Sequence, residues 1–214
     1  MKAEKQDATA PRRRLRAVNR EQQIVDEAVH FFAEKGFSGQ TRELASRLGI
    51  TQPLLYRYFP TKRDLIERVF DEVYLNRVNP DWLALITDRS KALHDRLCEF
   101  YRAYSDATYR YEWIRIYMFS ALMGEELNRR YTKLVETKIL TPICAELRDY
   151  CDLPGVDEKP ISQLELDEVW VMHGGLFYYA IRKHVYHSRV DEDFPAVVSR
   201  AVAVMLEGTK VVTS

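Results

Sequence analysis

The first clear pattern of apolar and polar positions lies between residues 19 and 36. Apolar residues recur there with i, i+4, i+7 and i+8 spacing, which predicts a helix with one buried face. Asn19 can cap the start of this helix, with Gln22 at the capping-box position, and Gly36 supplies the left-handed residue that ends it. The apolar face consists of Ile24, Ala28, Phe31 and Phe32.

The next pattern predicts two short helices between residues 41 and 59. Leu44 and Leu48 lie four residues apart on one helical face, and Leu55 and Phe59 repeat that spacing further along. Gly49 stands between the two pairs, where the chain has to turn sharply. Two short helices that share an apolar core across a tight turn form a helix-turn-helix, whose second helix fits the major groove of DNA.

A fourth helix follows directly. Thr61 is placed to cap it, Asp64 occupies the capping-box position, and Leu65, Val69 and Val73 form a buried stripe. From there to the end of the chain no strand-like alternation appears. Further helices are expected near residues 88–108, 112–122, 125–150, 165–187 and 193–208, with a Pro/Gly-containing loop at 152–162.

These patterns predict an all-α protein of about nine helices with two domains. A three-helix, helix-turn-helix domain precedes a larger helical domain that we expect to bind a ligand and to dimerise. The predicted parts are a flexible basic arm (1–18), a DNA-binding domain (19–64) and a regulatory and dimerisation domain (65–214).

Charge adds a distinction between the two ends of a chain whose formal net charge is zero. Residues 1–63 contain 13 basic and 7 acidic side chains, a net charge of +6, which leaves 19 basic and 25 acidic side chains, or −6, for residues 64–214. A basic front indicates contact with a polyanion, although a solvated charged face gives the same count.

Composition excludes several classes of protein. No apolar run approaches the roughly 20 residues of a membrane span, and no signal peptide precedes the first helix, so we expect a cytoplasmic protein without membrane contact. Cys98, Cys144 and Cys151 are odd in number and lack metal-ligand spacing, which favours buried free thiols. We expect no metal, no cofactor and no catalytic residues.

The second short helix carries side chains suited to nucleic acid on its outward face. Thr51 can cap it, and Pro53 falls in the first turn, where a missing N–H is tolerated. Glutamine can read adenine, leucine can contact a thymine methyl group, and arginine can reach guanine or phosphate. Tyrosine and lysine can donate to phosphates. The residues concerned are Gln52, Leu54, Tyr56, Arg57 and Lys62.

The segment FFAEKGFSGQTRELASRLGITQPLLYRYFPTKRDL, residues 31–65, resembles the DNA-binding domain of the tetracycline-repressor (TetR) family. The resemblance covers roughly residues 20–70. It implies a homodimer that binds a palindromic operator in double-stranded DNA and represses transcription until a small-molecule effector binds the C-terminal domain.

Carried over by position, the resemblance also implies individual DNA contacts. It implies base or phosphate contacts for Thr41 and Arg42, groove contacts for Gln52, Pro53 and Leu54, and phosphate contacts for Tyr56 and Lys62. Two departures stand out: the loop before Thr41 is one residue shorter than the family spacing, and Tyr58, which is expected to contact the DNA backbone, replaces a frequent histidine.

The last two helices are the candidates for dimerisation. The 193–208 segment has almost no polar face, so it needs cover on more than one side. Gly174 and Gly175 lie within the preceding helix, which favours close helix approach either within the chain or across a twofold axis. The remaining candidates are Val198, Ala201, Val202 and Met205.

Two clusters of aromatic residues, at 100–119 and 170–179, provide candidates for an effector pocket. Apolar walls with a few hydroxyl, imidazole or indole groups are typical of small-molecule sites, although aromatic residues at helical spacing are more often plain core. The candidates are Tyr104, Trp113, Tyr117, Trp170, His173 and Phe177.

Two other readings stay open at this stage. One is a helical enzyme or carrier, with His184 and His187 as ligands near His173 and Cys98 as a nucleophile, which no catalytic motif supports. The other is a helix-turn-helix module that has lost DNA binding and contacts proteins instead.

Overall fold

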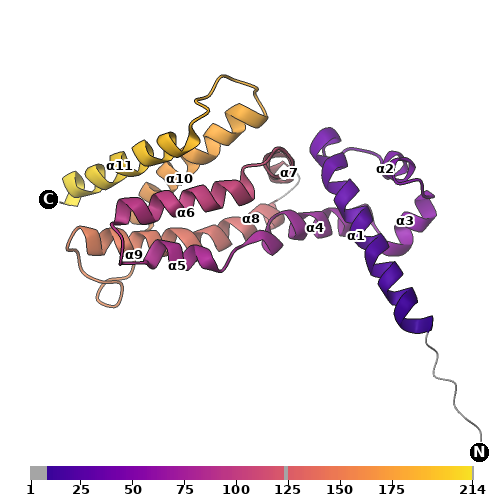
Figure 1. Ribbon diagram of the computed structural model, residues 1–214, viewed down its shortest axis with the longest axis horizontal. Helices are drawn as coiled ribbons and strands as arrows, with labels where there is room; N and C mark the ends of the chain where they lie inside the picture. Colours follow the sequence, from indigo (N-terminus) through magenta and orange to yellow (C-terminus); the bar gives the residue numbers. More distant parts are fainter. Residues whose placement is uncertain (1–8, 123–124, 214) are drawn as a thin grey trace, which may run out of the picture. The chain divides into compact units, whose positions relative to one another are not determined.

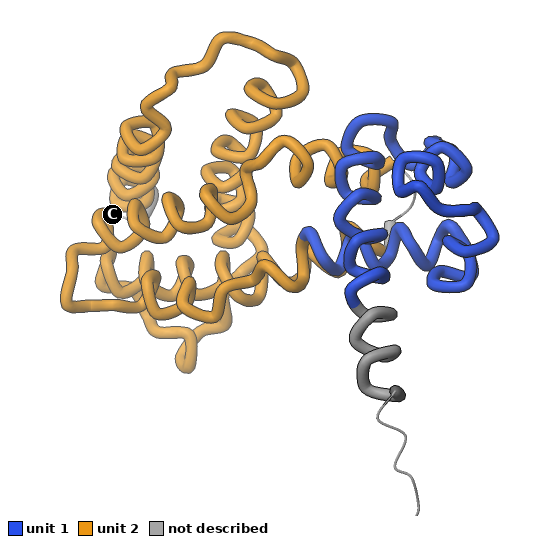
Figure 2. Tube along the Cα trace, turned by 45° about the vertical axis from the view of Figure 1, so that its right-hand side comes forward, with its two compact units in different colours: residues 1–73 blue, residues 74–214 orange. Residues whose placement is uncertain are grey.

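The computed structural model describes residues 9–122 and 125–213, which form helices and connecting turns without a strand. The chain divides into two compact units, Met1–Val73 and Tyr74–Ser214 (Figures 1 and 2). The first unit contains α1 (Thr9–Lys35), α2 (Thr41–Arg47), α3 (Gln52–Tyr58) and α4 (Lys62–Val73). The second contains η1 (Leu75–Arg77), α5 (Asp81–Thr87), α6 (Leu93–Thr108), α7 (Tyr111–Ala121), α8 (Glu125–Val135), the π-helical turn η2 (Glu136–Leu140), α9 (Thr141–Tyr150), α10 (Gln163–His184) and α11 (Phe194–Thr213).

The core of the first unit is the apolar stripe of α1, which packs on α2 and α4. Four residues of that stripe, Ile24, Ala28, Phe31 and Phe32, are fully buried, as predicted. Leu44 of α2 is fully buried too. Because α2 and α3 have only seven residues each, this shared burial is what holds them as helices.

The predicted turn and cap residues of this unit are confirmed. Gly36 and Gly49 have φ angles of +71° and +63°, in the left-handed region that glycine tolerates best. The Thr51 hydroxyl accepts a hydrogen bond from the backbone N–H of Leu54, and Thr61 and Asp64 form a reciprocal capping box.

The start of the first helix was predicted wrongly. α1 begins at Thr9, ten residues before Asn19, so half of the predicted arm is helical, and residues 1–8 lie outside the described residues. Pro11 is tolerated in the first turn, and arginine, leucine and alanine favour a helix without an apolar stripe. Gln22 is not a cap residue: it donates to Asp26 and accepts from Arg68 of α4.

The boundary between the units also differs from the predicted one after residue 64. The first unit extends to Val73, because α4 packs on α1 and buries Leu65, Val69 and Phe70 in the same core. The helix expected to open the second domain therefore completes the first.

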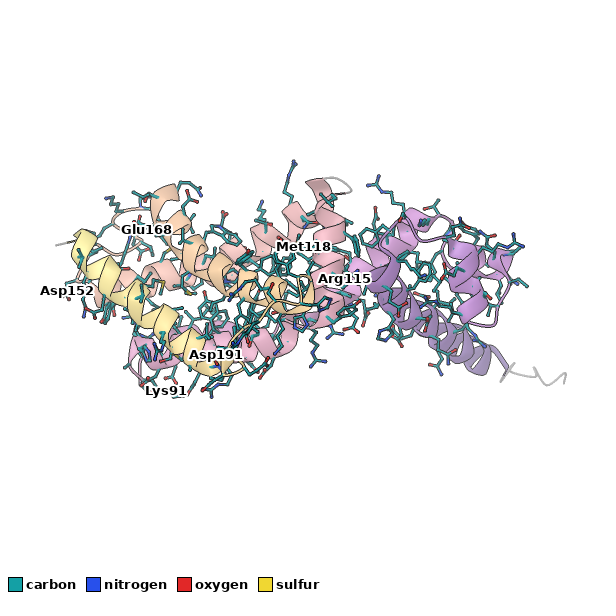
Figure 3. All side chains as sticks on the ribbon, turned by 90° about the horizontal axis from the view of Figure 1, so that it is seen from above. Lys91, Arg115, Met118, Asp152, Glu168 and Asp191 are labelled. Carbon is teal, nitrogen blue, oxygen red and sulfur yellow. The ribbon has the colours of Figure 1, made fainter. Side chains whose placement is uncertain are left out.

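In the second unit, α6 lies against α5 and α11, and α10 packs on α7, α9 and α11. Side chains fill the spaces between these helices in Figure 3, where Glu168 marks α10 and Asp191 marks the connection to α11. The nine predicted helical segments are all found within the described residues. Helix α5 was missed, because its seven residues contain an unbroken apolar run and no clear helical period; Trp82 and Ile86, four residues apart, are the two that are buried.

Three ion pairs, centred on Glu146 and Arg148, join elements of the second unit. Glu146 of α9 is 2.7 Å from Arg96 and 3.1 Å from Arg89. Arg148 pairs with Glu165 at the start of α10 at 2.6 Å, and this hydrogen bond lowers the pKa of Glu165 to about 2. Arg148 also donates to the carbonyl groups of Pro154, Lys159 and Pro160, so it fixes the loop between α9 and α10.

No helix in the described part of the chain has the length and apolar character needed to cross a membrane.

Gly39 generates a stability prediction. A Cβ atom at this position would lie 2.7 Å from Cε1 of Phe31, whose ring is fully buried and cannot move away freely. We expect Gly39→Ala to lower the free energy of unfolding by about 1–3 kcal/mol, as overpacked core positions do. The measurement is urea unfolding followed by far-ultraviolet circular dichroism.

The matched control is Gly155→Ala, because a Cβ atom at Gly155 would meet nothing within 4 Å. Equal stability of the two variants would contradict the packing of Gly39 against Phe31.

Candidate nucleic-acid interface

Helix α3 turns one face into the first unit and leaves the opposite face accessible. Leu55, together with Phe59 just after the helix, is buried at 1% and 6% exposure. On the other side Pro53, Tyr56 and Arg57 are exposed. Gln52, Leu54 and Tyr58 are half-buried at the edges of this face.

A small hydrogen-bond network joins α2 to α3. The hydroxyl group of Thr41, the first residue of α2, lies 2.9 Å from the Tyr56 hydroxyl and accepts a hydrogen bond from Gln52 Nε2 at 3.0 Å. Thr41 itself is only 6% exposed. The structure therefore places Thr41 beneath two of the predicted contact residues.

Three cations near this face have no carboxylate partner among the described residues. Arg42 on α2 and Arg57 on α3 are exposed, and Lys62 is half-buried in the first turn of α4. The first turn of a helix leaves backbone N–H groups free, and its dipole favours an anion. The capping box at Thr61 and Asp64 occupies part of that turn of α4.

Arg47 and Arg68 of the first unit have structural roles. Arg47 pairs with Glu34 at 2.9 Å and lies over the Phe31 ring at 5.1 Å from its centroid, so it ties α2 to α1. The hydrogen bond to Glu34 raises the pKa of Arg47. Arg68 pairs with Glu72 of its own helix. Carboxylates thus occupy Arg47 and Arg68, whereas Arg42 and Arg57 remain available to a ligand.

In the second unit, one small, partly open cavity of about 50 Å³ brings together all six residues predicted for effector binding. These are Tyr104 of α6, Trp113 and Tyr117 of α7, and Trp170, His173 and Phe177 of α10. Sequence analysis missed three wall residues from α8, Tyr131, Thr132 and Val135. Tyr131 and Val135 are four residues apart, which is the signal that could have revealed them.

The cavity is lined by uncharged groups. His173 is fully buried, and this burial lowers its pKa to about 4, so its imidazole is neutral at pH 7. The hydroxyl groups of Tyr104 and Tyr131 lie 2.8 Å apart. Trp113 stacks on Tyr117 with parallel rings, and its buried Nε1 has no hydrogen-bond partner within the described residues. The walls therefore offer at least one unused donor.

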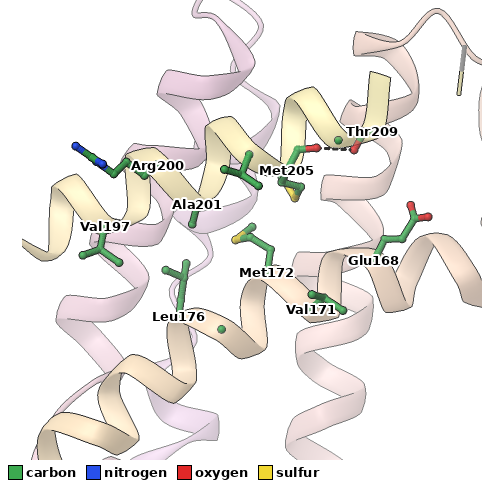
Figure 4. A pocket seen from close by; sticks show the side chains of 12 residues that line it. Glu168, Val171, Met172, Leu176, Val197, Arg200, Ala201, Met205 and Thr209 are labelled. Carbon is green, nitrogen blue, oxygen red and sulfur yellow. Dashed lines mark hydrogen bonds between the residues drawn. The ribbon is translucent and has the colours of Figure 1, made fainter. Parts of the chain in front are cut away.

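An apolar groove of about 640 Å³ runs between α10 and α11 (Figure 4). Three of the residues predicted for dimerisation, Gly175, Ala201 and Met205, line this groove. Val171 and Val204 also line it and are 77% and 73% exposed.

The other three dimerisation candidates do not line this groove. Val198 and Val202 are buried inside the unit, because α11 packs on α6 along that face. Gly174 lines the small aromatic cavity. A Cβ atom at Gly174 or Gly175 would meet nothing within 4 Å, so neither glycine marks a close helix approach within the chain.

The residues considered for catalysis do not assemble. Among the described residues, no group of three His, Cys, Asp or Glu side chains is placed to hold a metal ion. Cys98 lies 3.8 Å from His94, and burial raises the pKa of its thiol, which disfavours the nucleophilic thiolate.

Comparison with known proteins agrees with this geometry. The family model described as bacterial regulatory proteins, tetR family, matches residues 24–69. The HTH-type transcriptional regulator LuxR of Vibrio harveyi is 33% identical over 67 residues, and the match spans about a third of each protein: 31% of this chain and 33% of LuxR.

Solved structures share the fold over most of the chain at low sequence identity. A TetR-family transcriptional regulator from Mesorhizobium loti has a TM-score of 0.57 at 14% identity and covers 92% of this chain and 98% of its own. AmtR from Mycobacterium smegmatis has a TM-score of 0.56 at 18% identity and covers 90% of this chain and 91% of its own. Residues 24–69, which lie within α1 to α4, thus match the tetR family model, and about nine-tenths of the chain shares the fold of these solved structures.

Proposed function

We propose that this regulator binds a palindromic operator as a homodimer, represses transcription, and is released from DNA by a small-molecule effector. The observation that carries the DNA-binding part is the outward face of α3, where Pro53, Tyr56 and Arg57 are exposed above the buried Leu55. A short helix presented in this way fits the major groove.

The contact residues divide by chemistry. Gln52 reads adenine, Leu54 and Pro53 contact the groove wall, and Arg57 reaches guanine or phosphate. Phosphate contacts come from Tyr56 and, as cations, from Lys62 and Arg42. Tyr58 is half-buried at the edge of the recognition face, and its hydroxyl supplies one further phosphate contact.

Lys62 tests the phosphate contacts. We expect Lys62→Ala to weaken binding to all duplex sequences alike, because phosphates carry no sequence information. Removing one phosphate contact reduces the slope of log affinity against log salt by about one. The measurement is a fluorescence-anisotropy titration with operator and non-operator duplexes at several salt concentrations.

The control is Lys159→Ala, which removes the same charge from the loop between α9 and α10. An unchanged salt slope in Lys62→Ala, or an equal change in both variants, would remove Lys62 from the interface.

The dimer is supported by the exposed apolar groove of α10 and α11. Exposed apolar patches of this kind mark interaction surfaces, and a second copy of the same surface can cover it symmetrically. Two recognition helices held about 34–36 Å apart then read two half-sites one DNA turn apart, which gives more discrimination than one helix alone.

Val204 tests the dimer. It is 73% exposed, so Val204→Glu leaves the core of the unit intact while placing a charge in the groove. We expect the variant to sediment as a monomer at concentrations where the unchanged chain is a dimer, and to lose operator affinity at least tenfold, because burying an unpaired carboxylate is costly. Analytical ultracentrifugation measures the first quantity and anisotropy the second.

Val156→Glu is the control, because Val156 is 44% exposed on the loop between α9 and α10. A Val204→Glu protein that stays dimeric would place the interface elsewhere.

The effector site is supported by the small aromatic cavity. Its volume of about 50 Å³ holds little more than a water molecule or two, so a larger ligand has to move the aromatic walls apart. Those walls come from α6, α7, α8 and α10, and α10 also forms the groove. A ligand that separates them favours one arrangement of these helices, and it shifts operator affinity by its differential binding to the two states.

The uncharged walls define the expected effector class: small, aromatic and without net charge, with an acceptor for Trp113 Nε1. We expect benzamide to raise the thermal midpoint and lower operator affinity, whereas benzoate has no effect because the cavity offers its charge no cation. Gly174→Val, which fills open space in the cavity wall, should abolish both effects of benzamide. The measurements are tryptophan fluorescence during heating and operator anisotropy.

Binding of benzamide without any change in operator affinity would contradict the proposed coupling between effector binding and DNA binding. Equal responses to benzamide and benzoate would contradict the assignment of an uncharged effector.

A further inference from the structure

Thr41 is the one predicted contact residue of the first unit that the structure buries. At 6% exposure it has little surface to offer to DNA, yet its hydroxyl lies between Gln52 at 3.0 Å and Tyr56 at 2.9 Å. These two partners come from the recognition helix α3, 11 and 15 residues further along the chain.

The hydrogen bonds of this network have a preferred order of donors and acceptors. A threonine hydroxyl has one proton and two lone pairs, and one lone pair already accepts from Gln52 Nε2. If Tyr56 also donated to Thr41, the buried proton of Thr41 would have no acceptor among the described residues, and an unsatisfied buried donor is costly. The favoured sequence therefore runs from the Gln52 amide to the Thr41 hydroxyl, and from there to the Tyr56 oxygen.

This direction determines what each partner presents outward. Tyr56 accepts from Thr41, so its own proton is available for a phosphate oxygen. Gln52 uses one of its two N–H donors on Thr41, which leaves one N–H and the carbonyl oxygen outward. One donor beside one acceptor complements N7 and N6–H₂ of adenine, whereas guanine presents two acceptors, N7 and O6.

We infer that Thr41 is a positioning residue that sets base preference without touching DNA: its hydroxyl fixes the amide orientation of Gln52 for adenine and directs the Tyr56 proton toward the backbone. This inference rests on the proposed DNA binding through α3. It replaces the direct contact that the family resemblance implies for Thr41 with an indirect one.

The experiment uses the full chain and duplexes selected by it from a random library. Gln52→Ala identifies the base pair that Gln52 reads, as the position where an adenine preference of about tenfold is lost. We then expect Thr41→Val, which keeps the shape and removes the hydroxyl, to lose most of that same preference with an unchanged salt slope. Thr41→Ser, which keeps the hydroxyl, should restore it.

The double variant Thr41→Val/Gln52→Ala should lose no more preference than Gln52→Ala alone, because both changes remove one interaction. Additive losses, or an equal loss of affinity for every sequence in Thr41→Val, would overturn the inference and leave Thr41 as a structural or phosphate-contacting residue. Far-ultraviolet circular dichroism checks that each variant is folded.

Tyr56→Phe tests the network from its other end, should Thr41→Val not fold. Without an acceptor at Tyr56, the Thr41 proton turns to the Gln52 carbonyl and the amide reverses, which presents two donors outward. We expect guanine to become the better base at that pair by a few fold. Retained adenine preference in Tyr56→Phe would contradict the proposed proton direction.

The outcomes separate the two proposals. If the unchanged chain selects no duplex from the library, DNA binding itself fails. If it selects one and neither the Thr41 nor the Tyr56 variant alters the preference at the Gln52 pair, only this inference fails.

Discussion

The first unit depends on the burial of apolar side chains beneath two helices that are too short to stand alone. Seven-residue helices are unstable in water, and α2 and α3 persist because Leu44 and Leu55 are almost fully buried. This constraint also orients the functional face. Once Leu55 points inward, the period of the helix turns Pro53, Tyr56 and Arg57 to the surface.

Features that depend on neighbouring residues were predictable from the sequence, and features that depend on distant ones were not. The Gly36 and Gly49 turns and the Thr61–Asp64 box need only a few residues each and are present as predicted. The burial of Thr41 beneath α3 arises from contacts across 11 and 15 residues and has no local signature. The start of α1 was misplaced because Asn19 has the chemistry of a cap residue without having that position.

The second unit shows the same distinction. The aromatic clusters predicted which side chains line an effector pocket, and six of them surround one cavity. Their spacing could not reveal that Tyr131 of α8 joins them. It also could not reveal that burial keeps His173 neutral. In α11 an almost uninterrupted apolar sequence could not say which face turns inward. Val198 and Val202 occupy the core, whereas Ala201 and Met205 line the groove.

The two apolar faces of α11 have a consequence for the amount of folded protein in a cell. One side of α11 is buried in the core and another is open to solvent. If the open side is the dimer interface proposed above, folding stability is linked to protomer concentration by mass action. Protomers at low concentration would unfold and be degraded more readily than protomers at high concentration. The amount of regulator would then fall more steeply than its synthesis when expression is reduced, a sharpening that needs no additional component.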